Sequence, residues 1–206
     1  MPKYKLHYFG VRGRGEIIRL VLTVAGQDFE DRRITQEEWP KVKSEIPSGQ
    51  VPLLEVDGKH MNESLAIARY LAREYDLGGK TNHEQYLVDR VVGAVDDYFT
   101  KAVQILFLEK DEKKKAELQK ALDDEHTPRF LKLFTKYLEE SGGDGDFFVG
   151  NSGTLADLAV HDCFTTFLKQ NDKLLDKYPK LQANRKATEA LPHMADYLAK
   201  RPDVPI

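Results

Sequence analysis

Side chains that could carry chemistry gather at turns in the first third of the chain. Tyr8 lies near the end of a strand-like segment, Arg14 opens one helical pattern and Ser64 opens another. Trp39 and Lys43 are one helical turn apart, so they would share a face of a helix. A phenol donates hydrogen bonds, arginine is a permanent cation, and the N–H groups at a helix start attract carboxylates. Together these groups indicate a polar site with an anion-binding corner.

Each residue of this set also has a structural explanation. A tyrosine at a strand end packs more often than it catalyses, and Trp39, the single tryptophan, would serve equally well as half-buried packing. Glu63 and Ser64 form the predicted anion-binding corner, although a plain helix cap explains Ser64 nearly as often. The functional prediction therefore depends on the combination of these residues.

Residues 1–78 are predicted to form an α/β domain that positions these side chains. Strand and helix patterns alternate along it, which is typical of a β-α-β unit followed by a hairpin. The expected strands cover 4–9, 29–34, 51–56 and 59–62, and the expected helices cover 17–24, 39–43 and 65–74.

Local signals mark the ends of these elements. Gly26 suits the position after a helix end, and Thr35 with Glu38 has the form of a capping box. Pro52 cannot donate to a sheet ladder, so it is expected at a strand edge or start, where a cis bond is one option. Asp57-Gly58 is a strong hairpin signal.

Residues 83–206 are predicted to form an all-helical domain after a linker at Gly78-Gly79. Strand patterns disappear there, and apolar residues recur at helical spacing. The expected helices cover 83–106, 113–140, 155–170, 178–190 and 193–200.

Composition argues against several classes of protein. The chain has 206 residues and a formal net charge of -3, which is too little positive charge for a nucleic-acid partner. The first residues lack the apolar core of a signal peptide and no long apolar segment follows, so a cytoplasmic protein without membrane insertion is expected. The single cysteine, Cys163, cannot form an internal disulfide, and its apolar neighbours predict burial. Scattered histidines and the incomplete fingerprint Gly13-Arg14-Gly15 disfavour a catalytic zinc ion and a dinucleotide.

Several blocks of sequence occur in an order and spacing shared with one family. They cover residues 4–9, 12–19, 30–31, 39–40, 49–52, 54–58, 64–71, 149–152, 154, 156–157 and 201–202. With these blocks the chain resembles the sigma-class glutathione transferases, the class that includes the glutathione-dependent prostaglandin D synthases. The resemblance spans essentially the whole chain. It implies a thioredoxin-like amino-terminal domain, an all-helical carboxy-terminal domain and a homodimer.

The resemblance also implies a catalytic group. Tyr8 would donate its hydroxyl to the sulfur of bound glutathione, and Arg14 would be a nearby cation. A free thiol titrates near pH 8.5, and lowering its pKa by about two units takes about 2.7 kcal/mol of thiolate stabilisation. One charge-assisted hydrogen bond, worth about 1.5–3 kcal/mol, supplies most of that amount.

Further residues are implied as the binding site for glutathione. Trp39 and Lys43 would hold its glycine end, and Glu63 and Ser64 its γ-glutamyl end. Many sigma-class enzymes have glutamine where this chain has Glu63, which adds a negative charge beside the γ-glutamyl carboxylate. The loop of Gly49, Gln50, Val51 and Pro52 would face the cysteine of glutathione, with the Val51 backbone in a strand-like pairing.

One more binding residue would come from the second half of the chain. Asp97 matches an aspartate that reaches the glutathione of the partner subunit. Some prostaglandin synthases bind a divalent cation through three aspartates between subunits. Here Asp96 and Asp97 are present, but Gly93 occupies the remaining position. No metal is therefore predicted, and glutathione is the only cofactor expected, as a co-substrate.

The leading function is attack of the activated thiolate on an apolar electrophile, a detoxification reaction, with hydroperoxide reduction as accessible chemistry. The second substrate would lie between the domains. The expected pocket residues are Phe9, Gly13, Arg14, Phe99, Gln104 and Leu106. Two alternatives stay open: a glutathione-dependent prostaglandin isomerase, and a ligand-binding or crystallin-like relative without activity. Retention of Tyr8 argues against the second alternative.

Overall fold

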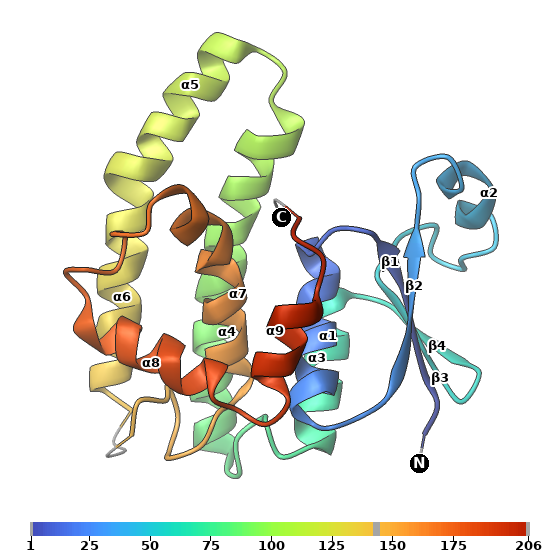
Figure 1. The fold of residues 1–206 in the computed structure, drawn as a ribbon, viewed down its shortest axis with the longest axis horizontal. Coiled ribbons are helices and arrows are strands. Elements are labelled where there is room, and N and C mark those ends of the chain that lie inside the picture. Colours follow the sequence, from blue (N-terminus) through green and yellow to red (C-terminus); the bar gives the residue numbers. More distant parts are fainter. Residues whose placement is uncertain (1, 142–144, 205–206) are drawn as a thin grey trace. The chain divides into compact units, whose positions relative to one another are not determined.

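The computed structural model describes residues 2–141 and 145–204, apart from the side chains of residues 106 and 107. The chain forms two compact units (Figure 1). Unit 1 contains the residues up to Gly78 together with those from Glu189 onward, and unit 2 contains Gly79–Thr188. The predicted sequence of an α/β part followed by a helical part is confirmed.

Unit 1 is built on a mixed sheet with the strand order β2-β1-β3-β4. β1 pairs in parallel with β2, and β3 is antiparallel to both β1 and β4. A parallel pair needs a crossover, and α1 supplies it, so the predicted β-α-β unit is confirmed. The strands are β1 Tyr4–Phe9, β2 Phe29–Ile34, β3 Leu53–Val56 and β4 Lys59–Met61.

The two faces of β1 differ in burial. Tyr4, Leu6 and Tyr8 are buried on one face, while the alternate residues are partly exposed, as the sequence pattern predicted. The turn between β3 and β4 has positive φ at both Asp57 and Gly58, which is the geometry that the Asp-Gly signal favours.

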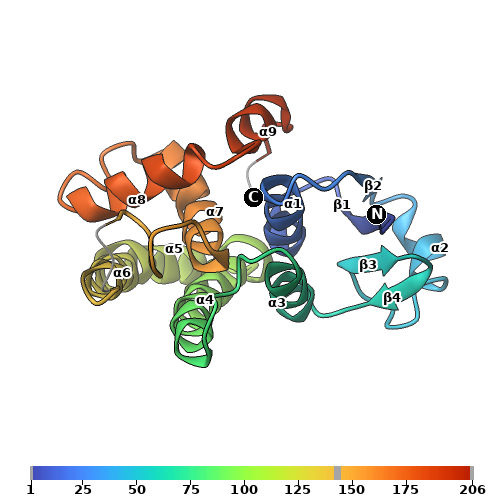
Figure 2. The ribbon, with the colours of Figure 1, turned by 90° about the horizontal axis from the view of Figure 1, so that it is seen from below.

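Helices cover both sides of this sheet (Figure 2). α1 (Glu16–Val24) and α3 (Ser64–Glu74) lie side by side on one face. The short α2 (Trp39–Lys43) lies on the other side, and the turn η1 (Gly13–Gly15) leads into α1. Gly26 follows α1 with φ of 64°, the left-handed conformation expected there.

The last helix of the chain also belongs to unit 1. α9 (Met194–Lys200) packs beside α1, whereas the sequence pattern placed residues 193–200 in the helical domain. Helical periodicity reports an apolar face without its partner, so it could not assign α9 to a unit.

Unit 2 consists of helices around an aromatic core. The ring of Tyr98 contacts the rings of Phe130 and Phe164, and the Tyr98 hydroxyl is 2.7 Å from Oγ1 of Thr127. Cys163 is buried in this unit, as its neighbours predicted. The elements are α4 Asn82–Val103, η2 Gln104–Leu108, α5 Glu112–Ala121, η3 Leu122–His126, α6 Thr127–Glu139, α7 Leu155–Gln170 and α8 Pro179–Glu189.

Two predicted long helices are interrupted by π-helical turns. The stretch over 83–106 leaves α-helical geometry at η2, and the stretch over 113–140 is divided by η3. At the start of α7 the buried carboxylate of Asp157 accepts a 2.7 Å bond from the Thr154 N–H and a 3.0 Å bond from the Phe148 N–H. Among the described residues, no helix has the length and apolar character needed to cross a membrane.

Candidate functional site

The phenol of Tyr8 is held in a fixed position by burial of its ring and by a hydrogen bond to its oxygen. Its ring is buried at the end of β1, and its oxygen accepts a 2.9 Å hydrogen bond from the backbone N–H of Arg14. A phenol can accept one hydrogen bond while donating another, so this contact is compatible with donation by the Tyr8 hydroxyl. The turn after β1 therefore orients the tyrosine oxygen.

Two glycines let the backbone approach Tyr8. A Cβ atom on Gly13 would lie 2.5 Å from the phenolic oxygen, and one on Gly15 would lie 2.4 Å from the ring. Both distances are far below van der Waals contact, so only glycine fits without displacing the tyrosine. Sequence motifs alone placed Gly13 and Gly15 in an incomplete dinucleotide fingerprint and Gly13 in the second-substrate pocket, and they did not predict this contact with Tyr8. A Gly-x-Gly segment soon after a strand-end tyrosine was the available signal.

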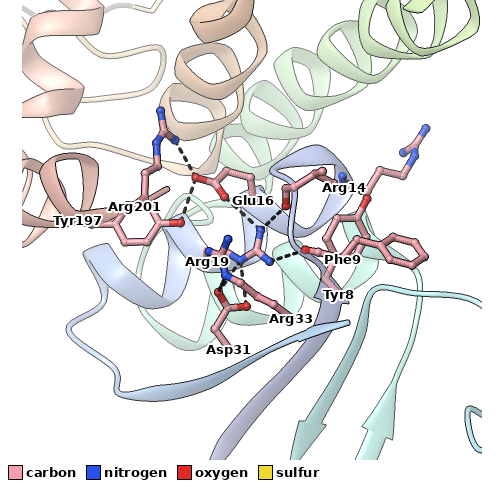
Figure 3. Close-up of polar contacts among 10 residues, drawn as sticks. Tyr8, Phe9, Arg14, Glu16, Arg19, Asp31, Arg33, Tyr197 and Arg201 are labelled. Carbon is pink, nitrogen blue, oxygen red and sulfur yellow. Dashed lines mark hydrogen bonds and ion pairs between the residues drawn. The ribbon is translucent and has the colours of Figure 1, made fainter. Parts of the chain in front are cut away.

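Arg14 contacts Tyr8 through its backbone. Figure 3 shows its guanidinium pointing away from the phenolic oxygen. Its predicted role as a catalytic cation stays a prediction, whereas the contact in the structure is the N–H bond.

Trp39 packs against a small hydrophobic cluster. Its ring is half-buried and meets the ring of Phe9 edge-to-face, with centroids 5.1 Å apart. Ile34, Ile46 and Leu53 form the buried part of this core. Phe9, predicted to contact the second substrate, therefore also supports the tryptophan.

The start of α2 is fixed by the predicted capping box. The Thr35 N–H donates to the Glu38 carboxylate over 2.9 Å, and the Glu38 N–H donates to the Thr35 hydroxyl over 3.2 Å. Arg32 lies 2.8 Å from the same carboxylate, and this hydrogen bond lowers the pKa of Glu38. These contacts place Trp39 in the first turn of α2.

The loop before β3 lies next to the exposed Lys43. A Cβ on Gly49 would be 3.7 Å from Cε of Lys43, so the lysine stem passes over this glycine. Gly49 has φ of 63°, and the Val51-Pro52 peptide bond is cis, the option that the sequence left open for Pro52. The structure thus brings together Trp39, Lys43, Gly49, Gln50, Val51 and Pro52 around α2 and the loop that follows it.

The start of α3 differs from the prediction. Ser64 is the first helical residue and is buried, whereas Glu63 is the N-cap and makes no side-chain capping bond. The predicted cap at Ser64 is therefore wrong by one residue. Glu63 has φ of 69°, a conformation that costs a non-glycine residue about 1–3 kcal/mol and is often found at functional sites. The first N–H groups of α3 thus have no capping oxygen from the Glu63 side chain.

The predicted residues of unit 2 lie on α4 and the turn after it. Asp97 and Gln104 are exposed, and Phe99 is half-buried. The side chain of Leu106 lies outside the described part of the chain. Within the described residues, no cluster of three or more histidine, cysteine, aspartate or glutamate side chains could hold a metal ion.

Comparison with known proteins defines the class to which this fold and site belong. Residues 4–73 match the glutathione S-transferase N-terminal domain, and residues 96–201 match the glutathione S-transferase C-terminal domain. The chain belongs to the glutathione S-transferase family. The predicted thioredoxin-like amino-terminal domain and helical carboxy-terminal domain are therefore confirmed.

Individual relatives indicate the class within the glutathione S-transferase family. The chain is 45% identical over 206 residues to hematopoietic prostaglandin D synthase from Gallus gallus, covering 100% of both chains. The structure of rat hPGDS complexed with a quinoline has a TM-score of 0.89 and 39% identity, covering 99% of this chain and 100% of the rat chain. A sigma class GST from Fasciola hepatica has a TM-score of 0.88 and 37% identity, covering 100% of this chain and 99% of its own. The predicted resemblance to the sigma class is confirmed.

Proposed function

We propose that this transferase activates the thiol of glutathione through Tyr8 and conjugates it to apolar electrophiles. The observation that carries the proposal is the 2.9 Å bond from the Arg14 N–H to the Tyr8 oxygen. This donor draws electron density from the oxygen, which strengthens the phenol as a donor to a thiolate. Thiolate sulfur then bonds to the electrophilic carbon, and a leaving group departs or, in an addition, the product takes up a proton.

The glutathione would extend from α2 to α3 across unit 1. Lys43, a cation beside Gly49, suits the glycine carboxylate, and the half-buried Trp39 offers an N–H donor and an apolar surface. The backbone of Val51 and the loop residues Gly49, Gln50 and Pro52 would face the cysteine. The positioned Tyr8 oxygen supports the same placement of the sulfur.

The γ-glutamyl group would lie at the start of α3. The N–H groups of the first helical turn and the Ser64 hydroxyl suit its carboxylate, and the exposed Glu63 suits its ammonium group. Asp97 of the partner subunit would add a second carboxylate to that ammonium. This contact requires a homodimer, in which a two-fold axis makes every contact reciprocal.

A second candidate is supported by the names of the relatives. The Gallus gallus protein is named a prostaglandin D synthase and the rat structure hPGDS, and an isomerase of this kind would convert an endoperoxide with glutathione as cofactor. Conjugation and isomerisation share Tyr8 but differ in the second substrate. Detoxification in the cytoplasm, where the glutathione pool is kept reduced, suits the first candidate.

A glutathione-dependent activity screen separates these candidates. The native protein and the Tyr8→Phe variant would be tested with halogenated aromatics, unsaturated aldehydes, hydroperoxides and prostaglandin endoperoxides. We expect Tyr8-dependent thioether products with the first two groups. A dominant prostaglandin product would favour the isomerase, and an absence of turnover with every substrate would favour a crystallin-like relative.

A further inference from the structure

Arg19 is a charged side chain in the interior of unit 1. Its side chain is only 1% exposed, and it lies on α1 beside the turn that follows β1. A buried guanidinium is costly unless its donors are satisfied. In this structure each nitrogen of the Arg19 guanidinium donates a hydrogen bond. The acceptors of these bonds indicate which parts of unit 1 the buried charge holds together.

Two of these partners belong to the backbone around Tyr8. Nη2 donates to the carbonyl of Phe9 over 3.2 Å, and Nη1 donates to the carbonyl of Val11 over 2.9 Å. The guanidinium carbon is also 5.7 Å from the centroid of the Tyr8 ring. Arg19 thus joins the end of β1 to the turn whose N–H bonds the tyrosine oxygen (Figure 3).

The other partners hold the guanidinium in place. Nε donates to both carboxylate oxygens of Asp31 on β2, over 3.1 and 3.2 Å. Nη1 also lies 3.3 Å from the carboxylate of Glu16, whose side chain is likewise 1% exposed. Because Asp31 comes from β2 and Glu16 from the start of α1 itself, carboxylates from two elements hold the planar group in one preferred orientation.

The remaining partners of the Glu16 carboxylate come from the carboxy-terminal end of the chain. Its second oxygen accepts a 2.7 Å bond from Arg201 and a 3.0 Å bond from the Tyr197 hydroxyl. Both partners come from α9 and the residue that follows it. Without Arg201 and Tyr197, the buried carboxylate of Glu16 would keep its contact with Arg19 through one oxygen and would leave the other oxygen unsatisfied.

We propose that Arg19 is a positioning residue for Tyr8, and that Arg201 and Tyr197 hold it in place through Glu16. For stability alone, apolar packing could replace the buried ion pairs of Arg19. Apolar side chains could not supply the donors that Arg19 gives to the carbonyls of Phe9 and Val11 beside Tyr8. The proposal relies on the proposed function of Tyr8. Its consequence is that the end of the chain influences how well the tyrosine stabilises the thiolate.

The test uses the whole chain of 206 residues and two variants near its carboxy terminus. Tyr197→Phe removes one hydroxyl and keeps the ring, and Arg201→Met removes the charge. Arg90→Met is the matched control, because Arg90 forms a 2.8 Å ion pair with Glu140 within unit 2. Each variant is first shown to be folded by circular dichroism. The pKa of bound glutathione is then measured from thiolate absorbance, and kcat/KM is measured at pH 6.5 and pH 9.

We expect the bound thiol pKa to rise by about 0.5–1 unit in Arg201→Met and by less in Tyr197→Phe. Since one unit is tenfold in the protonation equilibrium, kcat/KM at pH 6.5 should fall about three- to tenfold. At pH 9, above the pKa of about 8.5 of a free thiol, most of this loss should disappear. Arg201→Lys, which keeps the charge, should recover most of the native thiol pKa, and the control should keep it unchanged.

A purely structural role gives a different result, in which kcat/KM falls equally at both pH values while the thiol pKa stays constant. That result would overturn the proposal, even if only Tyr197→Phe could be purified. Tyr8→Phe is measured in parallel. If it raises the thiol pKa and the variants at the chain end do not, the positioning role fails alone. If Tyr8→Phe leaves the pKa unchanged, the proposed function fails as well.

Discussion

The backbone N–H of Arg14 donates a 2.9 Å hydrogen bond to the phenolic oxygen of Tyr8. This contact joins the turn before α1 to the last buried residue of β1. An oxygen that accepts from an N–H becomes a better O–H donor, because hydrogen bonds in a chain polarise one another. The pair thus gives the amino-terminal unit a donor whose position is set by the backbone.

Replacing Tyr8 with phenylalanine should remove thiol activation while leaving glutathione binding nearly unchanged. The ring stays and only the hydroxyl is lost, so the bound thiol pKa should rise. Turnover near neutral pH should fall about ten- to a thousandfold, the scale of losing one donor to an anion. Ultraviolet titration of the bound thiolate measures the change, and an unchanged pKa would move the catalytic role to another residue.

Replacing Gly15 with alanine should displace Tyr8 without straining the backbone. Gly15 has φ of -84°, which alanine adopts freely, but its Cβ would lie 2.4 Å from the tyrosine ring. Overpacking of this kind costs about 1–3 kcal/mol, so we expect lower thermal stability together with a higher thiol pKa. Gly10→Ala is the matched control, because a Cβ there meets no atom within 4 Å. Equal behaviour of the two variants would contradict the steric contact.

Replacing Ser64 with alanine should weaken glutathione binding about tenfold and leave the bound thiol pKa unchanged, since one hydrogen bond to a charged group is lost. The serine is not the N-cap of α3, so the helix itself should persist. Isothermal titration gives the affinity, and circular dichroism reports the helix content. A loss of helix content without a loss of affinity would return Ser64 to a structural role.

Replacing Asp97 with alanine should weaken the binding of glutathione without changing the oligomeric state. The side chain is exposed on α4, so we expect its loss to leave the proposed dimer intact. Affinity for glutathione should fall about tenfold to a hundredfold if the carboxylate binds the partner's ligand. Sedimentation measures the dimer and titration the affinity, with the exposed Asp172→Ala as control. A monomeric native protein with full activity would remove the cross-subunit contact.

Acid should destabilise the protein partly through His7. Burial lowers the pKa of His7 below its ordinary value of 6.5, Lys5 lowers it further, and Glu55 acts in the opposite direction. The unfolded chain therefore binds this proton more readily than the folded chain. Above pH 6.5, His7 is neutral in both states and has no effect on the free energy of unfolding. As the pH falls from 6.5 toward the pKa of His7 in the folded protein, protonation of the unfolded chain lowers that free energy. Nuclear magnetic resonance titration of the ring should give a midpoint below 6.5, and a higher midpoint would contradict the prediction.

Local signals in the sequence predicted most elements of unit 1. The alternation from Tyr4 to Tyr8 and the Asp57-Gly58 turn depend on side-chain period and backbone preference, which neighbouring residues determine. The capping box of Thr35 and Glu38 is local in the same sense. At α3 the local signal was ambiguous by one residue, because the positive φ of Glu63 is not a conformation that glutamate favours by itself.

The amino-acid sequence by itself determined the fold class, the family and the residue types of the candidate site, because these depend on periodicity and on motifs of adjacent residues. Only the tertiary structure decided what Gly15 and Arg19 do. Gly15 matters through its approach to the Tyr8 ring, and Arg19 through carbonyls and carboxylates on separate elements. Glu16 meets Arg201 across 185 positions of sequence. Buried polar groups find partners wherever the packed chain supplies them, so no local pattern encodes the pair.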